Sequence, residues 1–461
     1  MNEQLHTLLK KYDIAGPRYT SYPTAPAWQE DIGPESFQNS LAALQDGDLL
    51  SLYIHIPFCE NLCHFCGCMK MITTKHDVSG PYTQALLKEI DRIADIINTH
   101  KPQVSANQIH FGGGSPNFLH PSELEAIVKK IRERFVITGD AEIAIEMHPR
   151  TSTREFCEMV SQLGFNRISL GLQDLDPKVQ KLINRHQTFE MTRDMLDLLR
   201  NLGLKSFNFD LIYGLPGQTL ETWTKSLEQV ISLKPDRLAV YSYAHIPWLK
   251  PYQRSFEDKD LPSPELKLQL FEKAYEAFKQ AGYTPIGMDH FALPQDELAR
   301  AHEDGSLHRN FMGYSTRKES HQIGFGVSSI SFVDGNYFQN TKEIPIYEES
   351  VQKGQLTTNR GFILTTDDMI RRDLITKIMC VGRVKIKDFD QQWGITFRKY
   401  FENELEDLIP MIEDELVRLD DQEFKAINQG FLFLRNIAMH FDRYLQSIRE
   451  KASNPVFSKT V

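Results

Sequence analysis

The chain has 461 residues, of which 41% are hydrophobic and 25% charged, a composition typical of a globular protein with one large domain and a smaller one. Its formal net charge is −10 and it has no long lysine or arginine run, which argues against a nucleic-acid-binding surface. We find no long apolar stretch and no apolar signal core near the N-terminus, and the few cysteines are mostly clustered. We therefore expect no membrane span, no export and a cytoplasmic location.

The first 48 residues are predicted to form an N-terminal helix and arm. Residues 1–12 place Leu5, Leu8 and Leu9 on one side of a short helix. Residues 15–28 contain three prolines and should be extended. This arm is either a strap packed on the core, which we favour, or a lid that offers Arg18 to an anion.

Strand and helix patterns alternate from residue 51 to residue 245. Between the strands lie helical patterns such as 81–97 and 122–135, and Ser122 with Glu125 suggests a capping box for the second of these. Six such units in succession predict an α/β fold with a parallel sheet, most simply a curved or barrel-like (β/α)6. The six predicted strands are 51–57, 108–114, 142–149, 167–174, 206–216 and 237–245.

Each predicted strand has one apolar and one polar face. In 142–149, for example, Ile143, Ile145 and Met147 alternate with Glu146 and His148. A strand buried on both faces should be continuously apolar, and a closed barrel is filled by branched apolar side chains. A buried polar face needs partners. We therefore predict a splayed, incomplete barrel whose interior holds a polar ligand.

The barrel and its extension are predicted to span 49–355. Residues 284–294 suggest a further strand, and the glycines of IGFGVSS at 323–329 suggest a close backbone approach. A break near 355–366 separates a smaller, mostly helical C-terminal domain, 356–461, in which residues 423–436 suggest a small wing or hairpin.

Four of the six cysteines lie within ten residues, as Cys59, Cys63, Cys66 and Cys68. Neighbours this close cannot all form disulfides without strain. The spacing C-x3-C-x2-C-x-C indicates a metal or iron–sulfur site. A structural zinc site is the alternative, but zinc ligands usually come as two pairs, and no second pair is present.

The first three cysteines have a spacing similar to that of the radical S-adenosylmethionine (SAM) enzymes. Three thiolates on a [4Fe–4S] cluster leave one iron open to chelate SAM and pass an electron to its sulfonium, which yields a 5′-deoxyadenosyl radical. The segment HFGGG at 110–114 presents bare backbone at a strand end, where barrel ligands bind; read alone, it is more simply a tight turn.

Polar residues at later strand ends extend this pattern. Glu146, Gln173 and Asp210 offer acceptors for ribose hydroxyls, Arg185 offers a cation for a carboxylate, and Ala244 with the backbone can frame an adenine. Taken singly, each is as readily a surface hydrogen-bonding group or a rim ion pair.

The chain resembles the family of oxygen-independent coproporphyrinogen III oxidases. The resemblance implies a three-quarter (β/α)6 barrel with a largely helical C-terminal domain, and a monomer that holds two SAM molecules beside one cluster. The motifs that carry it are GPRYTSYPTA at 16–25, YIHIPFC at 53–59, CGC at 66–68, HFGGG at 110–114, DLIYGLP at 210–216, GMDHFA at 287–292 and LHRNF at 307–311.

The resemblance also implies residue roles. The cluster ligands are Cys59, Cys63 and Cys66, while Cys68 is needed for activity without being a ligand. The first SAM contacts Tyr53, Gly113, Glu146 and Ile330. The second contacts Phe65, Gly114, Ser115, Gln173, Arg185, Asp210 and Ala244. The sequence departs from the family at Ser115, usually Thr, and at His148, usually Asp.

The implied reaction is the oxidative decarboxylation of coproporphyrinogen III to protoporphyrinogen IX. The radical takes a hydrogen atom from the β-carbon of a propionate, and loss of CO2 and one electron leaves a vinyl group, on two rings. The cluster needs an external one-electron donor, and Arg18 is predicted to clamp a propionate. The alternative is a haem chaperone on the same scaffold, but such relatives typically lack the CGC cysteine and the PRYTSYPTA arm, both present here.

Overall fold

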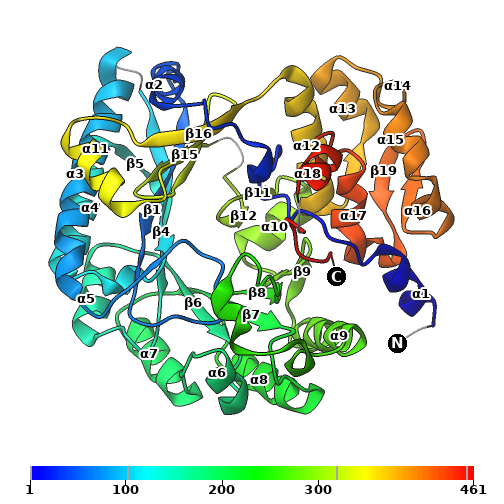
Figure 1. Ribbon diagram of the computed structural model, residues 1–461, viewed down its shortest axis with the longest axis horizontal. Coiled ribbons are helices and arrows are strands. Elements are labelled where there is room, and N and C mark those ends of the chain that lie inside the picture. The colour runs from blue at the N-terminus through cyan, green and yellow to red at the C-terminus, as the bar shows by residue number, and fades with distance from the viewer. Residues whose placement is uncertain (1–2, 101–102, 318–319, 453–454, 461) are drawn as a thin grey trace.

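The computed structural model describes residues 3–100, 103–317, 320–452 and 455–460. All six predicted barrel strands form, and each pairs in parallel with the next. Figure 1 shows them along an open curve with helices on its outer side, which confirms the incomplete (β/α)6 barrel. The strands are β1 (Leu49–Ile56), β4 (Ser105–Gly113), β5 (Val136–Met147), β6 (Arg167–Gln173), β7 (Ser206–Tyr213) and β8 (Arg237–Ser242).

The outer helices bury one apolar stripe each against the strands. In α4, Leu124, Ile127 and Ile131 are buried. The predicted capping box was wrong by two residues: the carboxylate of Glu123 accepts from the backbone N–H of His120 at 2.8 Å, because Pro121 already fixes the start of the helix. The outer helices are α3 (Ser79–Ile97), α4 (Pro121–Arg134), α5 (Arg154–Gln162), α6 (Pro177–Leu182), α7 (Phe189–Asn201), α8 (Leu220–Ser232) and α9 (Pro264–Gln280).

Both edges of the barrel sheet are extended by strands from later in the chain. β13 pairs in parallel with β1, and β14, β15 and β16 follow it antiparallel. At the other edge, the predicted strand in 284–294 is instead two short strands, because the chain turns at Gly287. These strands are β9 (Thr284–Ile286), β10 (His290–Ala292), β13 (His321–Phe325), β14 (Ile330–Val333), β15 (Asn336–Asn340) and β16 (Thr358–Ile363).

The close backbone approach predicted for 323–329 is confirmed. Gly326 has a φ of +94°, and a Cβ there would lie 2.8 Å from the carbonyl oxygen of His55. The hydroxyl of Tyr82 donates to the same carbonyl at 2.8 Å and accepts from the N–H of Val327 at 3.0 Å. This contact fixes β13 against the end of β1.

Near the amino ends of the barrel strands, charged side chains on the polar faces form ion pairs within the protein. Arg167 Nε lies 2.6 Å from Glu142 Oε2, and Arg237 Nε lies 2.9 Å from Asp296 Oδ1. Arg237 also pairs with Glu297 at 2.8 Å. The protein's own ion pairs therefore occupy part of the predicted polar interior at the amino ends of the strands.

The N-terminal region packs on two different cores. Phe37 and Leu41 of α2 (Pro34–Ala42) belong to the barrel core, whereas Leu5 and Leu8 of α1 (Glu3–Tyr12) pack with the C-terminal helices. In the arm, Tyr22 is only 1% exposed. The arm is thus a strap, as predicted; the first two residues of the predicted helix lie outside the described part.

The C-terminal region is mostly helical, as predicted. Figure 1 places it across the opening of the curve from α3 and α4. A small sheet in the order β17-β19-β18 confirms the predicted wing. The elements are α12 (Thr366–Val381), α13 (Ile386–Trp393), α14 (Phe397–Tyr400), α15 (Glu402–Asp407), α16 (Ile409–Glu413), α17 (Leu434–Met439), α18 (Leu445–Lys451), β17 (Arg383–Lys385), β18 (Val417–Leu419) and β19 (Glu423–Ala426).

The remaining elements connect these parts. α10 and the hairpin of β11 and β12 lie between β10 and β13 in the chain, and α11 lies between β15 and β16. Their bounds are α10 (Glu297–Asp304), β11 (His308–Asn310), β12 (Gly313–Ser315) and α11 (Ile344–Gln352).

Candidate active site

The segment that carries the four clustered cysteines, residues 59–70, forms a loop beyond the carboxyl end of β1. It begins at β2 (Phe58–Cys59) and ends at β3 (Met71–Ile72), which pair in parallel. Contacts from other parts of the chain tie the loop to the barrel. They are Asn184 Nδ2 to the Leu62 carbonyl (2.9 Å), the His64 N–H to the Ile183 carbonyl (3.0 Å), Lys250 Nζ to the Gly67 carbonyl (2.8 Å), and the Tyr252 hydroxyl to the Cys66 carbonyl.

The thiols of this loop have different surroundings. Cys59, Cys63 and Cys66 are half-buried, and Cys68 is exposed. A hydrogen bond between Cys66 and Cys68 lowers the pKa of the Cys66 thiol to about 5 and raises the pKa of the Cys68 thiol well above its usual range. Arg185 Nη1 lies 3.7 Å from Cys63 Sγ. The protein therefore favours a thiolate at Cys66 and places a cation beside Cys63.

The donor set suits an iron–sulfur cluster. Within the described residues, no three His, Cys, Asp or Glu side chains gather closely enough around one point to hold a single metal ion. In a [4Fe–4S] cluster each cysteine binds a different iron, so its thiolates surround a larger volume. Cys59, Cys63 and Cys66, spread along one anchored loop, match that need.

Three side chains lie next to one another on the inner faces of β1, β4 and β5. The ring of Tyr53 stacks on that of His110, with 5.9 Å between centroids. His110 Nε2 lies 3.1 Å from Glu146 Oε1. A Cβ on Gly112 would lie 2.7 Å from the same carboxylate oxygen, so a side chain there would displace the Glu146 carboxylate from this position.

His55 connects this group to the cysteine loop. Burial lowers the pKa of His55 to about 4, so the ring is neutral near pH 7. Its Nε2 lies 3.2 Å from the carbonyl of Met69, which can only accept, so we infer that Nδ1 accepts from the Tyr53 hydroxyl at 3.1 Å. Gly113 has a φ of +110°, and a Cβ there would lie 2.6 Å from the His55 ring. Gly113, the last residue of β4, thus makes room for His55.

Two buried polar atoms near the ends of β6 and α6 have no hydrogen-bond partner among the described residues. They are Gln173 Oε1 and Arg185 Nε. Gln173 is 8% exposed with a φ of +65°, and Arg185 Nη2 donates to the carbonyl of Gly171. Unpartnered buried polar atoms are costly unless a ligand or water satisfies them, so these two fit a bound polar molecule.

Asp210 lies on the inner face of the neighbouring strand, β7. Burial, and then the charge of Glu146, raise the pKa of Asp210 to about 7. Asn208 Nδ2 donates to Asp210 Oδ1 at 3.0 Å. Nearby, burial and then Arg185 lower the pKa of His148 to about 2, so the position where the family usually has Asp carries no charge.

The remaining predicted site residues come from separate elements. The Ser115 hydroxyl donates to Asn117 Oδ1 at 3.1 Å, and a Cβ on Gly114 would lie 2.7 Å from the Phe58 carbonyl. Phe65 packs on the hydrophobic cluster of Val179, Leu215 and Tyr243, and Ala244 follows β8, with its carbonyl accepting from Gln253 Nε2 at 3.1 Å.

The last two residues lie on other parts of the chain. Ile330 lies against Gly324, which is the partner of Tyr53 on β13. Arg18 Nη1 lies 3.6 Å from Asp289 Oδ2.

The fold therefore brings the predicted site residues of the barrel to the carboxyl ends of its strands, around the cysteine loop. Arg18 is the exception, because it comes from the arm and lies over β8, 5.4 Å from the ring centre of Tyr241. Sequence reasoning gave no role to His55 and His110. Both lie on polar strand faces, and HFGGG contains His110, so alternation was the signal that could have found them.

The described part of the chain contains no helix with the length and apolar character needed to cross a bilayer.

Comparisons with known proteins agree with this geometry. Residues 53–230 match the model of the radical SAM superfamily, and residues 364–433 match that of the HemN C-terminal domain. The chain is 43% identical to a Pseudomonas aeruginosa protein, over 96% of each chain, and 42% identical to one from Escherichia coli, over 98% of each; both are named oxygen-independent coproporphyrinogen III oxidase. The solved structure of Escherichia coli coproporphyrinogen III oxidase, titled a radical SAM enzyme, matches with a TM-score of 0.90 and 41% identity, covering 95% of this chain and 98% of that one.

Proposed function

The chain belongs to the oxygen-independent coproporphyrinogen III oxidases of the radical SAM superfamily, and from this we propose how its residues perform the reaction. The protein is an oxidoreductase of porphyrin biosynthesis that converts coproporphyrinogen III to protoporphyrinogen IX by oxidative decarboxylation. It uses a [4Fe–4S] cluster and SAM. The observation that carries the residue assignments is the group of polar side chains around the cysteine loop, including two buried atoms without partners.

We assign the cluster to Cys59, Cys63 and Cys66. When bound, the cluster and SAM supply a 5′-deoxyadenosyl radical that removes a hydrogen atom from the β-carbon of a propionate. The chain's own residues hold the loop in place, through His55 and the contacts of Lys250 and Tyr252. Cys68, exposed and hydrogen-bonded to Cys66, is free to act on the reacting molecules rather than on the cluster.

We further propose two SAM sites. Tyr53, Gly113, Glu146 and Ile330 surround the first, on β1, β4, β5 and β14. Phe65, Gly114, Ser115, Gln173, Arg185, Asp210 and Ala244 surround the second. The second site is supported by Gln173 and Arg185, each of which has a buried polar atom without a partner among the described residues, and by Asp210, which offers a carboxylate for ribose hydroxyls.

Arg18 is proposed to bind a substrate propionate. Its partner, Asp289, lies 3.6 Å away, longer than a close ion pair, and the guanidinium is about one-third exposed. Arg18→Gln should therefore raise the KM for coproporphyrinogen III about tenfold, because one charge-assisted hydrogen bond is lost. Steady-state kinetics measures this, with iron content as the control. An unchanged KM would contradict the clamp.

The deciding experiment for the function is product analysis. Enzyme with its cluster reduced, SAM, coproporphyrinogen III and a one-electron acceptor should give protoporphyrinogen IX, CO2, methionine and 5′-deoxyadenosine in anaerobic reaction. A haem chaperone would instead bind haem tightly and give no decarboxylated product. Absence of product with the cluster intact would refute the assignment.

Other features remain proposals. An external one-electron donor is required, and we propose a monomer in the cytoplasm, where cysteines that form no disulfide fit a reducing compartment. We also propose the division of the chain at 1–48, 49–355 and 356–461, with β16 (Thr358–Ile363) joined to the second unit by its pairing with β15.

A further inference from the structure

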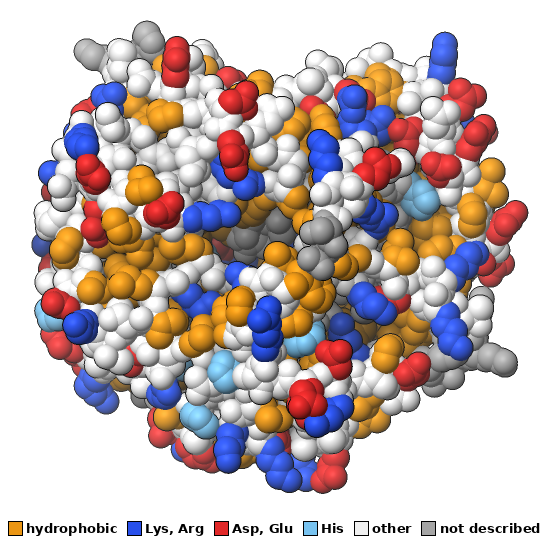
Figure 2. All heavy atoms as spheres, in the orientation of Figure 1, with side chains coloured by type: hydrophobic (Ala, Val, Ile, Leu, Met, Phe, Trp, Pro, Cys, Tyr) orange, Lys and Arg blue, Asp and Glu red, His pale blue; other side chains and the backbone are white. Residues whose placement is uncertain are grey.

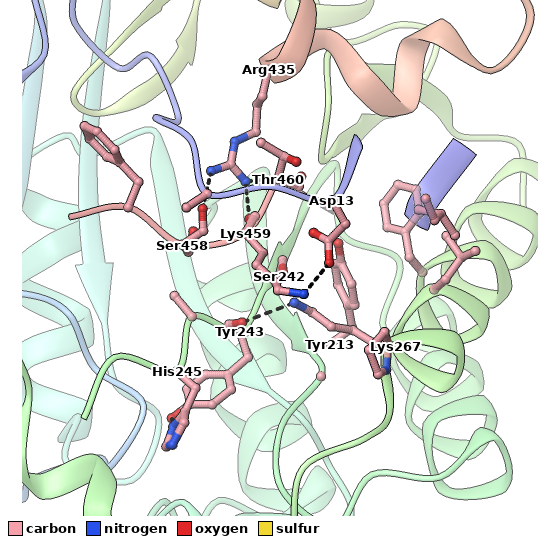
Figure 3. A pocket seen from close by; sticks show the side chains of 18 of the residues that line it. Asp13, Tyr213, Ser242, Tyr243, His245, Lys267, Arg435, Ser458, Lys459 and Thr460 are labelled. Carbon is pink, nitrogen blue, oxygen red and sulfur yellow. Dashed lines mark hydrogen bonds and ion pairs between the residues drawn. The ribbon is translucent and has the colours of Figure 1, made fainter. Parts of the chain in front are cut away.

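A cavity of about 630 Å³ lies between the carboxyl ends of β7 and β8, the start of α9 and the two terminal segments of the chain. Arg18 and Ala244 are both in its wall. Figure 3 shows Tyr213, Ser242 and Tyr243 from the strand ends on one side and Ser458, Lys459 and Thr460 on the other. In the same orientation as Figure 1, Figure 2 shows a central hollow with Lys and Arg side chains at several places on its rim.

The described residues that line this cavity carry an excess of positive charge, although the whole chain carries −10. Five cationic side chains face three carboxylates, those of Asp13, Glu265 and Asp289. The five are Lys10, Arg18, Lys267, Arg435 and Lys459. A local excess of cations in an acidic protein favours an anionic ligand.

Three of these cations are engaged by the protein. Arg18 lies near Asp289, and Lys459 Nζ lies 2.8 Å from Asp13 Oδ2. Arg435 donates to backbone carbonyls of both terminal segments, including that of Pro17 at 3.0 Å. Figure 3 shows the contacts of Arg435 and Lys459.

Lys267 is held more weakly. Its nearest hydrogen-bond acceptor is the carbonyl of Tyr243, 3.5 Å from Nζ. Burial lowers the pKa of Lys267 to about 8. The positive charges of Arg18, Arg435 and Lys459 act in the same direction, and the negative charge of Asp13 opposes them. Among the residues that the structure describes, the ammonium thus has no close anionic hydrogen-bond partner, which an incoming carboxylate would provide.

The fold nevertheless holds the Lys267 stem firmly. A Cβ on Gly214 would lie 3.0 Å from Lys267 Cε and 3.2 Å from Cγ, so the stem occupies the space over a glycine whose φ is +84°. Lys267 also lies in the first turn of α9, where the helix dipole disfavours a cation. Neither helix stability nor ion pairing accounts for a lysine here.

One segment joins the wall of the cavity to the cysteine loop. Ala244, His245 and Trp248 line the cavity, and a few residues further along the same segment Lys250 donates to the carbonyl of Gly67 at 2.8 Å. The cavity and the cysteine loop therefore share this segment as a common support.

We propose that Lys267 binds a propionate carboxylate of coproporphyrinogen III in this cavity. The proposal rests on the function given above, because that substrate carries four carboxylates. Arg18, on the same wall, is placed to bind another of them. Lys267 is thus a substrate-binding residue outside the cluster and SAM sites.

The test is direct binding of coproporphyrin III, the stable oxidised form of the substrate, to cluster-loaded enzyme by fluorescence titration. Lys267→Met keeps the stem over Gly214 and should raise the Kd about tenfold or more. Lys267→Arg keeps the charge and should bind nearly as well as the unmodified enzyme. Lys279→Met is the matched control, since Lys279 lies in the last turn of the same helix, is exposed and is not among the residues that line the cavity, and its Kd should hardly change. The KM for coproporphyrinogen III should follow the same order.

Three results would overturn the proposal. They are an unchanged Kd in Lys267→Met, an equal loss in the control Lys279→Met, which would indicate only the loss of a positive charge from the protein, and a loss of SAM affinity in place of porphyrin affinity. Binding does not depend on turnover, so a failure of the proposed reaction in the unmodified enzyme is separately visible in the product assay. Thermal unfolding of each variant identifies any that fail to fold.

Discussion

Replacement of Cys66 by serine is expected to remove the iron–sulfur cluster and all turnover, whereas the same change at Cys68 should retain the iron and still abolish turnover. The two thiols are hydrogen-bonded and only two residues apart. Because the same thiol is replaced by the same hydroxyl in both variants, a difference in iron content reports which of the two positions binds the cluster. The cluster needs three thiolates and one open iron, and the protein favours the thiolate at Cys66. Iron and sulfide analysis of anaerobic protein should give about four of each per chain for the unmodified enzyme and for Cys68→Ser.

The control for this pair is Cys157→Ala, a buried cysteine in α5 remote from the loop in sequence, which should retain both cluster and activity. If iron fell as far in Cys68→Ser as in Cys66→Ser, Cys68 would be a ligand. Zinc in place of iron in carefully anaerobic protein would remove the cluster assignment altogether.

Asp210→Asn is expected to keep the cluster, to cleave some SAM at the first site, and to form no protoporphyrinogen IX. A carboxylate that accepts two ribose hydroxyls makes two charge-assisted hydrogen bonds, each contributing roughly 1.5–3 kcal/mol. Loss of either weakens SAM binding by about tenfold or more. Chromatography of product and 5′-deoxyadenosine, with unmodified enzyme in parallel, measures the separation of the two activities.

The pH dependence of SAM binding gives a second test of the role of Asp210. Because burial and Glu146 raise the pKa of Asp210 to about 7, the carboxyl is mostly protonated at pH 6 and ionised at pH 8. Second-site SAM affinity of the unmodified enzyme should therefore rise from pH 6 to pH 8, and Asp210→Asn should lack this rise. Equal product yields from the two proteins would disprove the second-site role of Asp210.

Local patterns in the sequence were enough for the parts of the fold whose information lies within a few residues. The two-residue alternation in 142–149 placed Ile145 and Glu146 on opposite faces, as found. The cysteine spacing likewise placed three thiols on one loop, because a short loop cannot separate them. The N-terminal strap followed from its prolines and aromatic residues, which cannot form a helix and seek a surface to pack on.

Pairings between distant segments required the tertiary structure. Alternation tells which face a strand buries but not its neighbour, so the parallel pairing of β13 with β1, some 270 residues apart, has no local signature. The predicted single strand in 284–294 failed for a related reason: Gly287 takes a φ of +57° only because the chain turns there to pair with β8.

For the candidate site too, some residues could be predicted from the sequence and others only from the tertiary structure. Its motif residues could be named from the sequence, since the cysteines, the glycine run and the carboxylates lie at strand ends. The role of His55 as a link to Met69, and the ion pairs that fill the amino-end half of the barrel, depend on which side chains meet across the sheet. Lys267 is the clearest case: in the sequence it is one lysine on an amphipathic helix, and only the packing of α9 over Gly214 directs its ammonium into a cavity that both chain termini help to enclose.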